Sequence, residues 1–224
     1  MSRDRVLVWD GCVNVRDLGG LPLDGGGETQ FGVVVRADSI RGLTDRGWQA
    51  LLDYGVRSAV DLRGDEEAAG DQAAPVPVAR APIPPADEWP SMRETYVGML
   101  AEFRSQFVLA ADLIAASDEP AVVHCAGGRD RTGVLVALLL DAAGVGREAI
   151  AADHARSDES WAPYNDAWFA EAGTEAERQR RIRVAVPAGR TMIEVLDQVD
   201  RSYGGAAAYL STRSIDTLVL RLRG

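Results

Sequence analysis

A decapeptide in the middle of the chain combines the residue types that bind and cleave a phosphate ester. Residues 124–133 read HCAGGRDRTG, in which an arginine follows the cysteine six positions later and two glycines lie between them. The preceding AVVHC has the β-branched residues of a buried strand, and the following apolar VLVALLLDAAG is typical of a buried helix. The sequence therefore predicts a strand, a glycine loop and a helix in succession.

The glycine loop is predicted to be an anion site. Gly127 and Gly128 are expected to adopt backbone angles that other residues avoid, so that successive N–H groups point into one concavity. The N-terminus of the following helix adds positive potential at the same place. A phosphate or sulfate ion is expected to occupy the loop, bound by Ala126, Gly127, Gly128, Arg129, Asp130, Arg131 and Thr132.

Cys125 is the predicted nucleophile of this loop. Amide dipoles, a helix N-terminus and a nearby guanidinium all favour a thiolate over a thiol. Arg131 is placed to grip two oxygens of the phosphoryl group, and the Thr132 hydroxyl to donate a hydrogen bond to the sulfur. A lone cysteine beside a glycine turn is usually structural, but its coincidence with the arginine, the threonine and the buried helix favours catalysis.

These residues resemble the signature of the protein tyrosine phosphatase superfamily, a cysteine, any five residues, an arginine and then serine or threonine. More narrowly, the decapeptide is similar to the HCxAGKDRTG loop of the bacterial tyrosine-protein phosphatase family, which includes dual-specificity and phosphoinositide-active members. Three further segments resemble that family: NVRDLGG at 14–20, VDLR at 60–63 and YGGAAAYL at 203–210. The chain departs from the family pattern at Arg129, where the family has lysine, and at Val15, where it has phenylalanine.

The resemblance implies an α/β fold like that of protein tyrosine phosphatases, with a central mixed sheet flanked by helices and a mostly helical C-terminal half. We expect residues 1–224 to form a single phosphatase domain. The hydrophobic pattern is consistent with this layout. It predicts a strand from Phe31, a helix over 44–55, a strand over 58–62, loop or edge strand over 64–90, one long helix over 91–117, a strand over 121–125 and helices from 147 onward.

The proton donor for the leaving group has three candidates. Asp130 is the residue that the narrower family offers within the loop, although a salt bridge to Arg16 or Arg129 is an equal alternative for it. Asp61 lies at a strand end, where an open α/β sheet gathers its site residues. Asp87 would serve if a lid closes over the site.

Other polar residues are expected to support the loop. His124 precedes the nucleophile and is expected to point to the opposite face, as a brace beneath the loop. Asp153 matches an aspartate in a later helix of the family and is expected to orient the site indirectly. Asn14, Arg16 and Asp17 are expected to fix the loop at the edge of the site.

Composition limits the partners that the protein can have. The formal net charge is −10 and all 24 basic side chains are arginine, which disfavours nucleic acid and anionic membranes as ligands. Two cysteines are too few for a disulfide framework or a zinc site, and the thiolate mechanism needs no metal or other cofactor. The first residues lack a signal-peptide core and the longest apolar run is too short to span a bilayer, so a soluble cytoplasmic protein without integral membrane association is expected.

Four functions fit the sequence to different degrees. The leading one is a protein-tyrosine phosphatase of dual or triple specificity, which acts through a cysteinyl-phosphate. An enzyme for phosphoinositides or inositol phosphates is the alternative. A pseudophosphatase that only binds phosphate is disfavoured because Cys125 and Arg131 are both present. A rhodanese-like sulfur transferase is more remote, since its loop does not require the arginine and the threonine.

Overall fold

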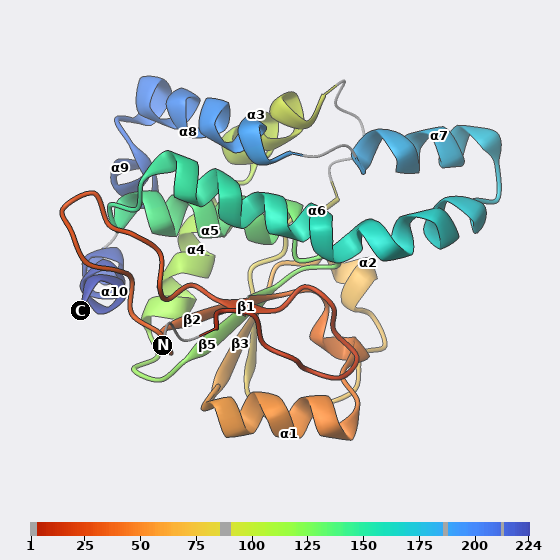
Figure 1. Ribbon diagram of the computed structural model, residues 1–224, viewed down its shortest axis with the longest axis horizontal. Coiled ribbons are helices and arrows are strands. Elements are labelled where there is room, and N and C mark those ends of the chain that lie inside the picture. Colours follow the sequence, from red (N-terminus) through yellow and green to blue (C-terminus); the bar gives the residue numbers. More distant parts are fainter. Residues whose placement is uncertain (1–3, 86–90, 186–187, 212) are drawn as a thin grey trace.

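A mixed five-stranded sheet forms the middle layer of the molecule (Figure 1). The structure, a computed structural model, describes residues 4–85, 91–185, 188–211 and 213–224. Its strands are β1 (Arg16–Asp17), β2 (Val34–Ala37), β3 (Ser58–Asp61), β4 (Val78–Arg80) and β5 (Ala121–His124). They lie in the order β1-β2-β5-β3-β4, with β1 antiparallel to β2 and the other pairs parallel. The strand that leads into the decapeptide is therefore central, as predicted.

Strands β2, β3 and β5 contribute side chains alternately to two hydrophobic cores, because successive side chains of a strand point to opposite faces. In β5, Ala121 and Val123 belong to one core and Val122 to the other. Cys125, just after the strand, belongs to the same core as Val123. This alternation decides which polar side chains can reach the cysteine.

The smaller core is covered by α1 (Asp45–Tyr54), which lies on one face of the sheet (Figure 1). The hydroxyl of Thr44 caps this helix by accepting a hydrogen bond from the N–H of Gly47. Gly55 ends it with φ of 102°, a left-handed conformation that favours glycine. Both signals were readable in the sequence, and the predicted boundaries are confirmed.

The larger core lies under a layer of helices on the opposite face of the sheet (Figure 1). Helices α4 and α5 contact the strands, and α6, α8 and α9 pack against this first row. The helices of the layer are α3 (Met92–Glu102), α4 (Arg104–Ala115), α5 (Asp130–Ala142), α6 (Arg147–Ala170), α8 (Gly189–Tyr203), α9 (Ala206–Leu210) and α10 (Arg213–Arg223). The expected fold class, a mixed sheet flanked by helices with a helical C-terminal half, is confirmed. No helix in the described ranges is long and apolar enough to cross a membrane.

Two further helices lie outside this helical layer. Helix α2 (Asp65–Ala68) follows β3, and α7 (Glu175–Val184) pairs with the distal part of α6. Figure 1 shows α6 and α7 extending together beyond the rest of the helical layer. Within the segment expected to be loop or edge strand, the described residues 64–85 thus contain a helical turn and the edge strand β4.

The long helix predicted over residues 91–117 is wrong in one respect, because two helices meet at Phe103. This residue has φ of −111° and ψ of 30°, outside the helical region. Helix α3 packs against α8, whereas α4 packs against β3 and α10, so the two segments follow different partners. No proline or glycine marks the break, and the sequence pattern alone therefore did not show it.

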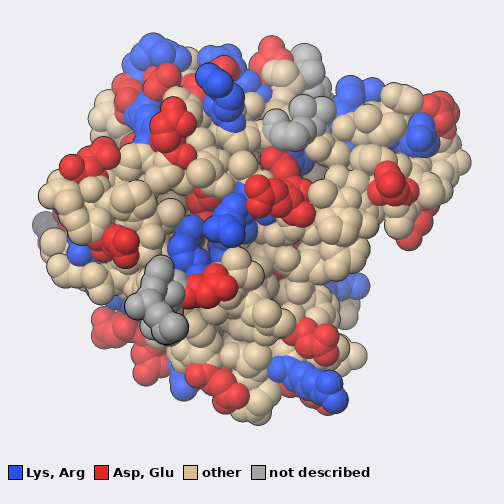
Figure 2. All heavy atoms as spheres, in the orientation of Figure 1, with Lys and Arg blue, Asp and Glu red and all other residues tan. Residues whose placement is uncertain are grey.

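On the face of the molecule seen in Figure 2, acidic and basic side chains are interspersed. Figure 2 shows acidic side chains spread over one face of the molecule, with basic side chains in separate groups between them. The net charge of −10 gives no broad attraction for an anion. Phosphate binding must therefore depend on a local arrangement of donors.

Candidate active site

The decapeptide forms the predicted unit of strand, loop and helix. Strand β5 ends at His124, and α5 begins at Asp130, so residues 125–129 form the loop between them. Cys125 is only 2% exposed, yet it lines a cavity of about 470 Å³. Arg129, Asp130 and Arg131 line the same cavity. The candidate nucleophile and the candidate phosphate-binding residues therefore meet at one place.

Gly128 is the glycine that the loop requires. Its φ is +64°, and a Cβ at this position would lie 2.4 Å from the carbonyl oxygen of Ala37. Gly127 does not have a positive φ, and a Cβ there would meet the Trp161 ring at an ordinary 3.6 Å. The expectation that both glycines adopt unusual backbone angles is thus confirmed for Gly128 and wrong for Gly127.

Arg131 is held by an acidic side chain that the sequence did not single out. Its two terminal nitrogens donate to the carboxylate of Glu67 at 2.5 Å and 2.9 Å, and one of them also donates to the carbonyl of Ile83 at 3.0 Å. Burial alone would lower the pKa of Arg131, but the hydrogen bonds to Glu67 and the negative charges nearby raise it. The guanidinium therefore stays charged and fixed at the wall of the cavity.

Asp130 lies at the cavity with its side chain 40% exposed. The hydroxyl of Tyr96 donates to its Oδ1 at 2.6 Å. Burial raises the pKa of Tyr96, so this phenol remains a donor at neutral pH. Of the two partners suggested for Asp130, Arg16 pairs with Asp153 instead, whereas Arg129 forms a long ion pair with it, with 4.0 Å between Nε and Oδ1.

Asp61 lies away from the cavity of Cys125. In the sheet register it pairs with His124, and both side chains line a second cavity of about 720 Å³. Arg63 donates to its carboxylate from Nε at 3.0 Å and from Nη2 at 2.8 Å. Burial alone would raise the pKa of Asp61, but the Arg63 hydrogen bonds hold it below its usual value. The third candidate acid, Asp87, falls outside the described residues.

Arg129 is largely buried, and its nearest carboxylate is that of Asp158 rather than Asp130. It is 8% exposed, and its Nε lies 2.7 Å from Oδ1 of Asp158 on α6. Burial raises the pKa of Asp158, while Arg129 works against this increase. The second guanidinium of the loop therefore lines the cavity with a carboxylate beside it.

Thr132 occupies the first turn of α5 and is fully buried. Its hydroxyl forms no hydrogen bond within the part of the chain that the structure describes. The predicted hydrogen bond from this hydroxyl to the sulfur of Cys125 is therefore not formed.

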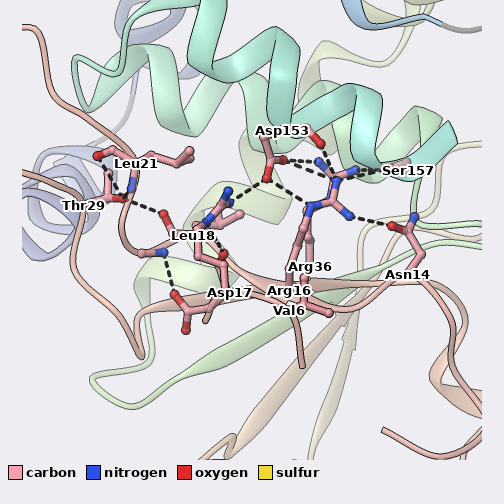
Figure 3. Close-up of polar contacts among 12 residues, drawn as sticks. Val6, Asn14, Arg16, Asp17, Leu18, Leu21, Thr29, Arg36, Asp153 and Ser157 are labelled. Atoms are coloured by element: carbon pink, nitrogen blue, oxygen red, sulfur yellow. Dashed lines mark hydrogen bonds and ion pairs between the residues drawn. The ribbon is translucent and has the colours of Figure 1, made fainter. Parts of the chain in front are cut away.

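A buried ionic cluster lies behind the loop (Figure 3). Asp153 on α6 accepts hydrogen bonds from Arg5 at 2.6 Å, Arg16 at 3.0 Å and Arg36 at 2.7 Å. Burial alone would raise the pKa of Asp153, but the three arginines hold it far below its usual range. The indirect role expected for Asp153 thus has a structural basis, since Arg36 also contacts the loop at the carbonyl of Gly128, 2.7 Å away.

The three residues expected to fix the loop have different roles. Asn14 donates from Nδ2 to the carbonyl of Gly127 at 2.9 Å, and its Oδ1 accepts from Arg16 at 2.6 Å. Asp17 instead accepts from the N–H groups of Gly19 and Gly32 at 2.6 Å and 2.9 Å. Asn14 therefore touches the loop, Arg16 acts through Asn14, and Asp17 stabilises a turn elsewhere.

Aromatic side chains of α6 form one wall of the cavity. Trp161, Tyr164 and Trp168 all line it, at a spacing that places them on one side of the helix. The indole N–H of Trp161 donates to the carbonyl of Gly127 at 2.8 Å. Tyr164 and Trp168 are 49% and 38% exposed, so apolar rings are presented at the mouth of the site.

The sequence reasoning missed Glu67, Tyr96, Arg36 and the aromatic wall. Glu67 lies in an acidic run, and Tyr96 lies in an ordinary helical pattern, so neither carried a local signal. The α6 residues did carry one, because Asp153, Ser157 and Trp161 recur every fourth position, on one face of a helix.

The fold and the loop together define the class of the protein, a phosphatase that hydrolyses phosphate monoesters. The model of the Tyrosine phosphatase family matches residues 7–223, and the chain belongs to this family. It is similar to a protein of Cupriavidus necator provisionally named a tyrosine-protein phosphatase, with 28% identity over 97% of this chain and 87% of the relative. A tyrosine-protein phosphatase of Nostoc commune is 33% identical over 55% of this chain and 47% of its own length.

Two further similarities are more limited. The triple specificity protein phosphatase PtpB of Mycobacterium tuberculosis is 47% identical over 47 residues, which are 21% of this chain and 17% of PtpB. Among solved structures, a cysteine-to-serine variant of P. aeruginosa TpbA in complex with phosphotyrosine aligns over 85% of each chain with 16% identity and a TM-score of 0.36.

Proposed function

We propose that the protein hydrolyses phosphotyrosine through a cysteinyl-phosphate intermediate, with Cys125 as nucleophile. The observation that carries this proposal is that Cys125, Asp130 and Arg131 line one cavity of about 470 Å³ beside an aromatic wall. Such a wall suits the flat ring of phosphotyrosine, because aromatic rings pack favourably against one another. A phosphoprotein is therefore the proposed substrate.

In the first step, the thiolate of Cys125 attacks phosphorus and the bond between phosphorus and the ester oxygen breaks. Arg131 and the loop amides stabilise the charge that spreads over the non-bridging oxygens. Asp130 gives its proton to the departing phenoxide, so tyrosine leaves as a neutral phenol. Asp130 suits this role better than Asp61, whose carboxylate is bound by Arg63 and lines another cavity.

In the second step, water attacks the phosphorus of the cysteinyl-phosphate. The Asp130 carboxylate takes a proton from this water, and the bond between sulfur and phosphorus breaks with its electron pair returning to Cys125. Inorganic phosphate leaves, and Asp130 is protonated again for the next substrate. The two steps need no metal ion.

Phosphoinositides or inositol phosphates are the second candidate substrates. The supporting observation is Arg129, which adds a second guanidinium to the cavity. Its neighbour Asp158, at 2.7 Å, offsets part of that charge. Because the added positive charge is partly offset, we prefer a phosphoprotein as substrate. Dual or triple specificity is tested by comparing the turnover of phosphopeptides and phosphoinositides.

Cys125→Ser tests the proposed function. We expect the variant to fold and to bind vanadate while turnover of an aryl phosphate falls at least about 10³-fold, as an order of magnitude for the loss of a nucleophile. Iodoacetate near pH 6 is expected to alkylate Cys125, with inorganic phosphate protecting it. Burial and nearby Asp38 raise the pKa of the other thiol, Cys12, which serves as the internal control in a mass spectrum. Wild-type turnover in Cys125→Ser would refute the mechanism.

A further inference from the structure

Three successive carbonyl groups of the phosphate loop are held from outside the loop. The backbone N–H of Ser39 donates to the carbonyl of Ala126 at 2.9 Å. Asn14 and Trp161 both donate to Gly127, at 2.9 Å and 2.8 Å.

Arg36 completes this set of external donors. It donates from Nη2 to the carbonyl of Gly128 at 2.7 Å. Each of the three peptide planes is thus fixed by a donor that does not belong to residues 125–129.

Fixing these carbonyls also fixes the N–H groups of the residues that follow them. In a trans peptide, the C=O of one residue and the N–H of the next point in opposite directions, and the described peptides are all trans. Carbonyls directed outward to Ser39, Trp161 and Arg36 therefore direct the N–H groups of Gly127, Gly128 and Arg129 away from those donors. This is the orientation that a nest of amides around a phosphoryl group needs.

Two of the side-chain donors, Arg36 and Trp161, are held by one face of α6. Asp153 and Ser157 lie four residues apart and bind the guanidinium of Arg36 at 2.7 Å and 3.1 Å. Trp161 lies a further four residues along the same face. Arg36 reaches this face because alternation along β2 directs it to the side of the sheet opposite Val35 and Ala37.

We propose that Trp161 and Arg36 are positioning residues, which hold the peptide planes of the phosphate loop in the orientation that binds the transferring phosphoryl group. The inference rests on the proposed function for its biological meaning, but it concerns oxyanion binding and is measured without turnover. A structural role alone would change stability and leave oxyanion affinity in the folded protein unchanged.

The first test is Trp161→Phe, which keeps an aromatic ring on the wall and removes the indole N–H. Orthovanadate affinity, measured by calorimetry, is expected to fall about fivefold, the order expected for one lost hydrogen bond. Trp168→Phe is the matched comparison, since it removes an indole N–H from the same wall without a hydrogen bond to the loop among the described residues; its loss should be below about twofold. Replacing Trp161 by benzothienylalanine, which has sulfur in place of the N–H, should reproduce the effect with the shape retained.

The second test is Arg36→Lys, compared with Arg5→Lys. Arg5 binds the same carboxylate of Asp153 at 2.6 Å, but its other hydrogen bond within the described residues goes to the carbonyl of Asp17 and not to the loop. Lysine cannot bind Asp153 and the Gly128 carbonyl with the fixed fork of an arginine, so vanadate affinity should fall about tenfold in Arg36→Lys and clearly less in Arg5→Lys. Each titration is made well below the melting temperature of the variant.

The outcomes separate this inference from the proposed function. Vanadate affinity at the wild-type value in Trp161→Phe and in the benzothienylalanine variant would overturn the role of Trp161. Equal losses in Arg36→Lys and Arg5→Lys would overturn the role of Arg36, because the cluster would then act only through general stability. Retained turnover in Cys125→Ser refutes the proposed mechanism and leaves these binding comparisons interpretable.

Discussion

Arg131 and Glu67 form a two-pronged ion pair at the wall of the cavity, with nitrogen to oxygen distances of 2.5 Å and 2.9 Å. The carboxylate of Glu67 also accepts the backbone N–H of Gly64 at 2.9 Å, at the start of α2. A helical turn remote in sequence from the decapeptide thus orients the arginine that is proposed to grip the phosphoryl group.

The first prediction concerns Glu67→Gln. A glutamine offers one carbonyl oxygen and no charge, so Arg131 loses half of the fork and part of its orientation. We expect kcat/KM for an aryl phosphate to fall about tenfold or more, since hydrogen bonds to charged groups contribute roughly 1.5–3 kcal/mol. Glu66→Gln, on the exposed neighbour, is the control. Equal activity of the two variants would show that Glu67 does not orient Arg131.

The second prediction identifies the general acid. Removing the true acid slows substrates with poor leaving groups more than substrates with good ones. We therefore expect Asp130→Asn to steepen the dependence of kcat on leaving-group pKa, whereas Asp61→Asn should leave this slope unchanged and act through stability. The measurement is a series of aryl phosphates assayed with both variants. A flat response in Asp130→Asn together with a steep one in Asp61→Asn would reverse the assignment.

The third prediction is a pH dependence of stability that originates at His124. Burial lowers the pKa of His124 to about 4 in the folded protein, from an ordinary value of about 6.5. In this window the unfolded state binds more protons, so stability falls as pH falls from 6.5 towards 4, by at most about 1.4 kcal/mol per pH unit. Urea unfolding of wild type and His124→Gln should show a smaller slope in the variant. Parallel curves would mean that His124 is not held neutral.

The fourth prediction concerns the buried cluster behind the loop. Asp153→Asn leaves the arginines around it without their shared carboxylate, and breaking a buried pair in this way costs about 3–5 kcal/mol. Because the pKa of Asp153 is held below its usual range, its stabilisation is complete above about pH 4 and is lost as pH falls further. Chemical unfolding at pH 7 and pH 3 should therefore show a smaller difference between variant and wild type at pH 3. Asp166→Asn, exposed on the same helix, is the control.

The features that could be predicted from the sequence are those formed by residues close together along the chain. The loop, its cysteine and arginine, and the flanking strand and helix lie within one short segment, and the caps of α1 are local signals at Thr44 and Gly55. The arrangement of Gly128 also follows from local geometry, since its φ is +64°. Such features need no knowledge of how distant segments meet.

The features that could not be predicted from the sequence depend on contacts between segments far apart along the chain. The pairing of Asp61 with His124 in neighbouring strands puts both on the face away from Cys125, and this register is not readable from either strand alone. The contact of Glu67 with Arg131 spans 64 positions. The break at Phe103 likewise depends on the different partners of α3 and α4.

The fifth prediction concerns Arg129 and Asp158, whose charged groups lie 2.7 Å apart at the cavity. A single phosphoryl group already meets Arg131, the loop amides and the helix N-terminus, so another cation matters most for a substrate with further negative charge. Arg129→Ala should lower kcat/KM for a multiply phosphorylated inositide about tenfold more than for a small aryl phosphate, a difference of about 1.4 kcal/mol.

Asp158→Asn is the matched variant that changes the charge at the cavity in the opposite direction, since it removes the carboxylate that offsets Arg129. Its ratio of inositide to aryl phosphate kcat/KM should rise. Both effects should shrink moderately as salt is added, because salt screens the exposed phosphates of the inositide more than the largely buried Arg129 and Asp158. The two variants and the wild type are compared at low and at moderate ionic strength with both substrates. If both substrates lose activity equally and independently of salt in Arg129→Ala, Arg129 supports the loop through Asp158 and does not select the substrate.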